Sequence, residues 1–170
     1  ICVSLHGVRN SAFKFGDNVV VSGTGPIGLA AIQCLKAAGA GKIIALGTNS
    51  AKEPIIKAYG ADYFINSKEC TDLASEVQKI LGSPVGADVV YETSLSNCVY
   101  QCVKPGGQVA IIGTIQEPMT ALVPGQFSIH EPNFQFSFTY TQEDVQIYLD
   151  MVASGKMHFP GMVTDVVSLD

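Results

Sequence analysis

The residues with the clearest chemical meaning are the glycines of Gly23-Thr24-Gly25-Pro26-Ile27-Gly28, which follow the apolar run Val19-Val20-Val21. In a G-x-G-x-x-G turn of this kind the first glycine permits the tight bend from strand to helix, the second leaves room for a pyrophosphate, and the third lets the helix pack on the strand. The helix that follows offers unpaired backbone N–H groups and the positive end of its dipole to the anion. The turn therefore predicts a dinucleotide-binding site.

The sequence on either side of the turn supports this interpretation. An amphipathic stretch runs from Leu29 to Ala38, and a second strand is expected from Lys42 to Leu46. A strand, a glycine turn, a helix and a further strand are the context that a dinucleotide-binding motif requires. The alternative is a glycine turn with a purely structural purpose.

The residue that ends the second strand indicates which dinucleotide is bound. Sites that prefer NAD usually carry Asp or Glu here, which accepts hydrogen bonds from the adenosine ribose, whereas this chain has Gly47. Without a carboxylate there is no charge repulsion against a 2′-phosphate. Thr48 and Asn49 can donate hydrogen bonds to phosphate oxygens, and Lys52 can add a positive charge. We therefore expect NADP to be preferred over NAD.

The same residues also admit a structural interpretation. Thr48, Asn49 and Ser50 are suited to cap the next helix, and Lys52 would then lie on its solvated face. Capping and phosphate binding can coexist, so both interpretations stay open.

Strand-like and helical patterns alternate along the chain, which is typical of a parallel sheet covered by helices on both faces. Strands are expected at 18–22, 42–46, 63–66, 88–91, 108–112 and 134–138, and helices at 2–11, 26–38, 51–59, 72–81, 96–103 and 143–153. Left-handed caps or turns are expected at Gly39, Gly60, Gly82 and Gly155. We therefore expect an α/β Rossmann fold: a doubly wound sheet of six parallel strands whose switch point lies beside the first strand, with the ligand across the carboxyl ends. The proline-containing stretch from Ile115 to Asn133 is expected to cross the surface near the site.

Composition limits the class of protein. The chain has 170 residues, of which 47% are hydrophobic and 15% charged, and this fits a single globular domain with a well-covered core. No apolar run approaches the roughly 18 to 20 residues of a membrane span, and no signal peptide is evident. The net charge of −5, without a Lys/Arg cluster, argues against a nucleic-acid partner. We expect a soluble, cytoplasmic protein.

Neither the cysteines nor the histidines form a metal-binding pattern. The cysteines include no C-x-x-C pair and are expected to be reduced thiols; they are Cys2, Cys34, Cys70, Cys98 and Cys102. Two of them, Cys98 and Cys102, lie four residues apart, but no third or fourth ligand is near in sequence. The isolated histidines are interpreted as structural or solvent-facing; they are His6, His130 and His158.

Five motifs, in order and over the whole chain, together resemble the medium-chain dehydrogenase/reductase superfamily. They are Gly23-Thr24-Gly25-Pro26-Ile27-Gly28-Leu29, Ala37-Ala38-Gly39-Ala40, Tyr59-Gly60-Ala61-Asp62, Gly86-Ala87-Asp88-Val89-Val90-Tyr91-Glu92 and Pro105-Gly106-Gly107-Gln108-Val109. The Pro-Ile-Gly-Leu form of the turn is similar to that of the zinc-dependent alcohol, polyol and threonine dehydrogenases, and Glu92 points the same way.

The resemblance implies a larger enzyme. Members of the superfamily carry a second, largely β catalytic domain that supplies zinc ligands, built mostly from sequence before the cofactor domain. This chain begins at the helix that leads into the first strand, and it ends where the family's chain crosses back. We therefore expect residues 1–170 to be a single cofactor-binding domain excised from a two-domain enzyme. It would have no catalytic residue and no metal site of its own, and it would be inactive alone.

By position, the resemblance assigns residues to the parts of the cofactor. Gly23 to Gly28 would hold the pyrophosphate, and Gly47, Thr48, Asn49 and Lys52 the adenosine end. Thr93 and Ser94 would border the cofactor, and Gly113, Thr114, Phe136 and Phe138 would face the nicotinamide. The alternative for the alternating Phe134, Phe136 and Phe138 is one buried strand face. In the family the last strand also joins two subunits, which makes a homodimer an expectation.

The leading hypothesis is that this chain holds NADP(H) in a zinc-dependent dehydrogenase that transfers hydride between the cofactor and an alcohol or carbonyl compound. Several alternatives stay open. The protein would otherwise be an NAD-dependent or zinc-free reductase of the same superfamily, or a binding module without catalysis. A methyltransferase has a similar glycine turn, but Gly47 removes the acid that such enzymes normally use to hold the ribose. The substrate would be selected mainly by the missing domain.

Overall fold

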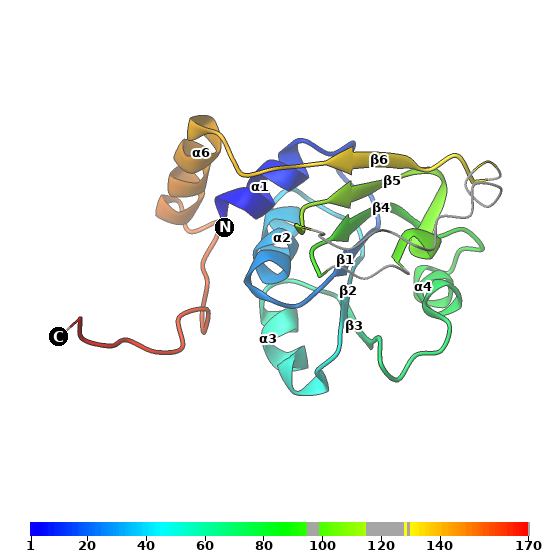
Figure 1. Cartoon of the computed structure of the whole chain (residues 1–170), viewed down its shortest axis with the longest axis horizontal. Coiled ribbons are helices and arrows are strands. Elements are labelled where there is room, and N and C mark those ends of the chain that lie inside the picture. Colours follow the sequence, from blue (N-terminus) through cyan, green and yellow to red (C-terminus); the bar gives the residue numbers. More distant parts are fainter. Residues whose placement is uncertain (95–98, 115–127, 129, 170) are drawn as a thin grey trace.

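The computed structural model describes residues 1–94, 99–114, 128 and 130–169. Six parallel strands form one sheet in the order β3-β2-β1-β4-β5-β6 (Figure 1). The strands are β1 (Val19–Ser22), β2 (Ile43–Gly47), β3 (Tyr63–Asn66), β4 (Ala87–Glu92), β5 (Val103–Ile111) and β6 (Asn133–Phe136). The order reverses beside β1, which confirms the predicted doubly wound fold.

Helices cover both faces of this sheet. They are α1 (Cys2–Arg9), α2 (Pro26–Ala37), α3 (Glu53–Ala58), α4 (Leu73–Leu81) and α6 (Gln142–Ala153), with the short 3-10 turns η1 (Ser50–Lys52) and η2 (Val99–Cys102). Figure 1 shows α1, α2, α3 and α6 along one side of the strands and α4 on the other. No helix within the described ranges is long and apolar enough to cross a membrane.

Alternate residues of the central strands enter two separate cores. Val19 and Val21 pack with α1, α2 and α3, whereas Val20 packs on the opposite face with α4 and η2. All three valines are fully buried. A strand that is buried on both faces needs apolar side chains at every position, which explains the continuous valine run before the glycine turn.

The predicted left-handed turns at four glycines are confirmed, whereas one predicted helix and the bounds of the last strand differ from the structure. Positive φ angles occur at Gly39, Gly60, Gly82 and Gly155, as left-handed caps or turns require. The helix expected at 96–103 is only the short turn η2 within the described residues, and Val103 already belongs to β5. The strand pairs Val103 with Ala87 and then Gln108 with Val89, because the intervening Pro-Gly-Gly segment interrupts the regular register. A strand broken in this way does not show a continuous apolar pattern.

The other difference concerns the last strand. It ends at Phe136 rather than at 138, and Phe138 is 80% exposed. Of the surface excursion expected from Ile115 to Asn133, residues 115–127 and 129 lie outside the described residues, as does Cys98. The other four cysteines are free thiols, and burial raises the pKa of Cys34 to about 12.

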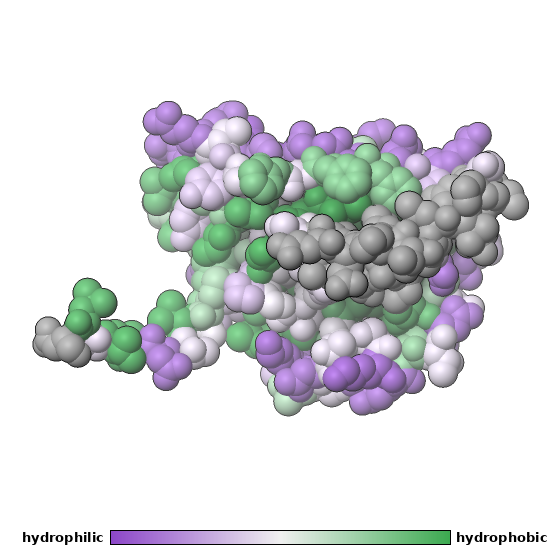
Figure 2. Space-filling view, viewed as in Figure 1, coloured by the Kyte–Doolittle hydropathy of each residue, from purple (hydrophilic) through white to green (hydrophobic). Residues whose placement is uncertain are grey.

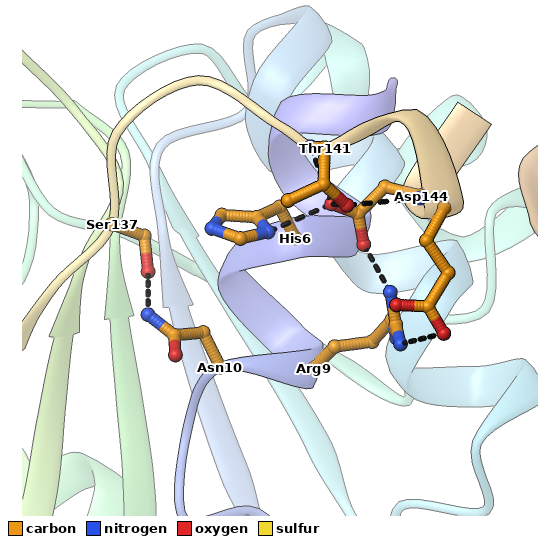
Figure 3. Close-up of polar contacts among 7 residues, drawn as sticks. His6, Arg9, Asn10, Ser137, Thr141 and Asp144 are labelled. Carbon is orange, nitrogen blue, oxygen red and sulfur yellow. Dashed lines mark hydrogen bonds and ion pairs between the residues drawn. The ribbon is translucent and has the colours of Figure 1, made fainter.

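A buried carboxylate joins the first helix to the last (Figure 3). Asp144 has no exposed side-chain surface; its Oδ1 lies 2.5 Å from Arg9, and its Oδ2 lies 2.8 Å from Nδ1 of His6. The backbone N–H and hydroxyl of Thr141 each donate to Oδ2 at 2.7 Å. The N–H of Asp144 donates back to Oγ1 of Thr141 at 3.2 Å, which completes a capping box at the start of α6. Burial of Asp144 raises its carboxyl pKa, but the hydrogen bonds from Thr141, Arg9 and His6 lower the pKa by more than burial raises it. The pKa of Asp144 is therefore well below the ordinary value.

The segment after α6 makes hydrogen bonds to α2 and to Tyr59 before the chain extends into solvent. The backbone of His158 makes two hydrogen bonds with the side-chain amide of Gln33 in α2: its N–H donates to Oε1 at 3.0 Å, and its carbonyl accepts from Nε2. The hydroxyl of Tyr59 donates to the carbonyl of Pro160 at 3.1 Å. Beyond Met162 the chain extends away from the body (Figure 1), and Val166 is 92% exposed.

Candidate functional site

A cleft of about 620 Å³ lies at the carboxyl ends of the central strands. Its walls come from the ends of β1 and β2, the glycine turn, the loop after β2, and the residues that follow β3 and β4. This is the point where the strand order reverses, and the loops on either side of such a point diverge and leave a crevice. The sheet topology thus positions the cleft where the sequence predicts a ligand.

The glycine turn enters the cleft with the geometry that its spacing predicts. Gly23 has a φ of +101°, which favours glycine, and its N–H donates to the carbonyl of Leu46 at 2.9 Å. At Gly28 a Cβ would lie 1.9 Å from the carbonyl oxygen of Gly23, so only glycine lets α2 pack this closely on the turn. Two of the three glycines are therefore required by the fold itself.

Gly25 differs from these two because nothing in the fold requires it. Its φ of −80° is open to any residue, and a Cβ built there would meet no atom within 4 Å. Gly25 is the N-cap of α2, and no side chain caps that helix end. Its missing side chain leaves open space beside the unpaired N–H groups of the first turn, where an anion is stabilised.

The far end of the cleft carries polar groups and one charge. The Oδ1 of Asn49 accepts from the N–H of Ala51 at 3.0 Å, so the predicted cap is present, while its amide NH2 makes no hydrogen bond to a described residue. Lys52 is the only charged side chain among the described lining residues, and it forms no ion pair within the described part of the chain. The neighbouring Glu53 is held 2.9 Å from Lys57 instead. This end of the cleft is therefore locally positive in a chain of net charge −5.

Three residues with hydroxyl groups line the cleft where β1 and β4 end. The side-chain oxygens of Ser22 and Ser94 lie 2.9 Å apart, and Thr93 donates from its hydroxyl to the carbonyl of Ser22 at 2.6 Å. The backbone N–H of Ser94 donates to Oε1 of the buried Glu92 at 2.6 Å. These contacts fix the loop after β4 against the end of β1.

The cleft brings together nine of the residues assigned from the sequence: Gly23, Thr24, Gly25, Gly47, Thr48, Asn49, Lys52, Thr93 and Ser94. Five further lining residues were not predicted: Ser22, Leu46, Ser67, Leu73 and Val99. Ser22 ends β1 and Ser67 follows β3, so both lie at the carboxyl edge of the sheet. This position is the sequence signal from which their place in the cleft could have been predicted.

The remaining assigned residues do not line this cleft. Pro26, Ile27 and Gly28 form the first turn of α2. Gly113 donates its N–H to the carbonyl of Glu92 at 3.0 Å, which places it at the carboxyl end of β4, and Thr114 next to it is exposed.

Phe134 and Phe136 in β6, and Phe138 just after it, also lie apart from the cleft. Phe134 packs partly against the core, whereas Phe136 is 66% exposed, so the alternative of one buried strand face is wrong for Phe136 and Phe138. Figure 2 shows apolar surface over β6 and along the C-terminal segment.

No group of three or more His, Cys, Asp or Glu side chains within the described ranges is placed to hold a metal ion. Among the histidines, His6 contacts Asp144 and His130 and His158 are exposed, as interpreted from the sequence. Among the described residues there is thus no set of zinc ligands, whereas the cleft is lined by glycines, hydroxyl groups and Lys52.

Comparison with known proteins gives a consistent result. A profile of the family described as zinc-binding dehydrogenase matches residues 26–154. The chain is 29% identical over 174 residues to D-xylulose reductase of Saccharomyces cerevisiae, covering 96% of this chain and 48% of the relative. It is 28% identical over 183 residues to S-(hydroxymethyl)glutathione dehydrogenase of Paracoccus denitrificans, covering 96% and 47%. The chain thus spans about half the length of the curated relatives it matches.

Solved structures agree with these relatives. The 2R,3R-butanediol dehydrogenase of Bacillus subtilis superimposes with a TM-score of 0.82 at 27% identity, over 94% of this chain and 45% of that one. A zinc-binding dehydrogenase of Sinorhizobium meliloti, bound to NADP, superimposes with a TM-score of 0.83 at 27% identity, over 96% of this chain and 49% of the other.

Proposed function

Because the chain belongs to the zinc-binding dehydrogenase family of the medium-chain dehydrogenase/reductase superfamily, we propose that it is the cofactor-binding part of an alcohol or polyol dehydrogenase. The complete enzyme would transfer hydride between NADP(H) and an alcohol or carbonyl compound. The nicotinamide supplies the hydride chemistry when it is bound, and the residues of this chain hold and orient it.

The observation that carries the proposal is the open space at Gly25. The fold accounts for the glycines at 23 and 28, but it leaves a glycine at 25 without a structural reason. A pyrophosphate that approaches the N-terminus of α2 supplies that reason, since any side chain there would occupy its position. A purely structural glycine turn does not explain this residue.

A preference for NADP is supported by the charge and shape of the adenosine end. Gly47 offers no carboxylate, and Lys52 is free to pair with a phosphate. The NADP-bound structure from Sinorhizobium meliloti demonstrates that a similar fold holds this cofactor. We assign Thr48 and Asn49 to the same phosphate, and Thr93 and Ser94 to the border of the nicotinamide ribose, with Gly113, Thr114, Phe136 and Phe138 on the nicotinamide side.

The zinc chemistry of such an enzyme would come from residues outside those described here. Since the chain covers about half of its relatives, we propose that it is one domain of a two-domain protein and does not turn over alone. We also propose that β6 joins two copies, because its outer edge carries exposed apolar side chains.

Calorimetric titration of the chain with NADP⁺ tests the proposal, with Gly25→Ala as the informative variant. Alanine fits the backbone at 25 without strain, so we expect unchanged thermal stability and a loss of affinity of at least about tenfold, or 1.4 kcal/mol. The matched control is Gly28→Ala, in which the Cβ collides with the backbone of Gly23. This variant should lose thermal stability, whereas Gly25→Ala should not. If the unsubstituted chain binds neither dinucleotide, or if Gly25→Ala binds equally well, the proposal is wrong.

A further inference from the structure

The side chain of Thr24 occupies the space beside the last residue of β2. A Cβ built on Gly47 would lie 2.7 Å from Oγ1 and 2.9 Å from Cγ2 of Thr24, closer than real Cβ atoms approach other atoms. The ring of Phe64 is the next neighbour at 3.0 Å, a distance that a shift of a few tenths of an ångström would relieve. Thr24 itself is 8% exposed, and its hydroxyl makes no hydrogen bond to a described residue.

Rotation of the threonine side chain does not remove this obstruction. Two of the three staggered positions around its Cα–Cβ bond face Gly47, because both heavy atoms are in contact with the built Cβ. A β-branched residue fills two of these three positions in every rotamer, so at least one heavy atom always faces Gly47. A serine fills only one position and can turn it away.

The backbone at both residues is also held in place. The N–H of Gly23 donates to the carbonyl of Leu46 at 2.9 Å, which ties the turn to the end of β2. The carbonyl of Gly47 accepts from both the N–H of Ser67, at 2.8 Å, and its hydroxyl, at 3.2 Å. Neither segment can therefore separate from the other without breaking hydrogen bonds at the edge of the cleft.

We propose that Thr24 determines which dinucleotide this site accepts, because its side chain excludes any acidic residue from position 47. This inference rests on the proposed function. A carboxylate at the end of β2 is the group that would hold an unphosphorylated ribose and repel a 2′-phosphate. Thr24 fills the space from which a carboxylate at position 47 would reach the ribose. The site is therefore restricted to dinucleotides that bind without a carboxylate on the adenosine ribose.

The first test measures thermal unfolding in a cycle of variants. Gly47→Ala is expected to lower the Tm by about 2–10 °C in the unsubstituted chain, as overpacking does. In a chain that carries Thr24→Ser the same substitution should lower the Tm by less than half as much. Thr24→Val is the matched control, because valine keeps the branched shape without the hydroxyl. In a chain that carries Thr24→Val, Gly47→Ala should lower the Tm as much as it does in the unsubstituted chain.

The second test measures the ratio of the Kd for NAD⁺ to the Kd for NADP⁺ by calorimetry. Gly47→Asp alone, or with Thr24→Val, should weaken both dinucleotides and leave the ratio within about threefold. Gly47→Asp together with Thr24→Ser should move the ratio toward NAD⁺ by about tenfold or more, since a carboxylate then reaches the ribose hydroxyls.

The outcomes separate the two proposals. If Gly47→Asp alone moves the ratio as far as the double variant does, Thr24 does not control the site and the inference is wrong. A coupling seen in the Tm but absent from the ratio also overturns it, because Thr24 would then be a packing residue only. If the unsubstituted chain binds neither dinucleotide, the proposed function fails and the inference fails with it.

Discussion

At the scale of single residues, Lys52 shows how one unpaired side chain gives the cleft its charge. It lies on the turn after β2, it lines the cleft, and it has no acidic partner among the described residues. Lys57, one turn further along the same segment, is engaged by Glu53 at 2.9 Å. Both lysines are exposed, but only Lys52 lines the cleft and only Lys57 is paired with Glu53, so Lys57 is a suitable control for Lys52.

We expect Lys52→Gln to weaken NADP⁺ binding by about threefold to tenfold, and NAD⁺ binding by much less, because an exposed ion pair contributes modestly. The loss should shrink as salt is raised from about 0.05 M to about 0.5 M, where the charges are screened. Titration of Lys52→Gln and of the control Lys57→Gln with both cofactors measures this. Equal losses for NADP⁺ and NAD⁺ would show that Lys52 does not contact the 2′-phosphate.

Some residues of the site could be predicted from the sequence and others could not. The turn from Gly23 to Gly28 is predictable because its spacing follows from local geometry, and Gly47 is predictable because it ends a strand at a known distance from that turn. Ser67 was missed because it reaches the cleft only through the pairing of β3 with β2, which is a long-range contact. The obstruction between Thr24 and Gly47 was missed for the same reason.

At the scale of elements, the contact between α1 and α6 depends on one buried carboxylate. The capping box Thr141-x-x-Asp144 starts α6 at Gln142, one residue before the predicted start at 143. The partners of Asp144 in α1 are His6 and Arg9, which lie more than 130 residues away in sequence. No local sequence pattern predicts these contacts.

Replacing Asp144 by Asn should destabilise the domain by about 2–4 kcal/mol at neutral pH, because Arg9 and His6 lose a charged acceptor. The folded-state pKa of Asp144 is lowered, so its contribution is present above the ordinary value of 3.8 and is lost as the pH falls below that value toward the lowered pKa. Urea unfolding between about pH 7 and about pH 3 measures the free energy of unfolding of both proteins. The difference between the unsubstituted chain and Asp144→Asn should become smaller below about pH 4.

The control for this prediction lies on the same helix. Asp150 is exposed and accepts a hydrogen bond from Gln146 at 2.9 Å, so Asp150→Asn should change the free energy of unfolding by less than about 0.5 kcal/mol. A constant difference between Asp144→Asn and the unsubstituted chain across this pH range would contradict the role given to the carboxylate.

At the scale of the whole molecule, no strand among the described residues pairs with the outer edge of β6. The N–H of Ser137 donates to the carbonyl of Ile111 in β5 at 2.9 Å, and residues that alternate along a parallel strand bond the same neighbour, so the N–H of Phe136 points to the open side. Exposed apolar side chains accompany this edge. An edge of this kind favours pairing with a second copy.

Phe136→Pro should prevent that pairing, because proline removes the outward N–H while the bonds from β6 to β5 remain. Phe136→Thr is the control, since it removes the ring but keeps the N–H. Sedimentation equilibrium should show a concentration-dependent dimer for the unsubstituted chain and a Kd at least about tenfold higher for Phe136→Pro than for Phe136→Thr. A chain that stays monomeric at about 100 µM would rule out this interface.

The pairing of Gln33 with His158 has a consequence for the order in which the domain is completed during synthesis. Gln33 is 6% exposed, and the partner of its amide lies 125 residues later in the chain. A ribosome makes α2, β1 and β2 long before it makes that partner, so the first half of the sheet must exist for a time with this polar group unsatisfied beside its core. The helix that follows the glycine turn therefore keeps Gln33 without this partner until 125 further residues have been made.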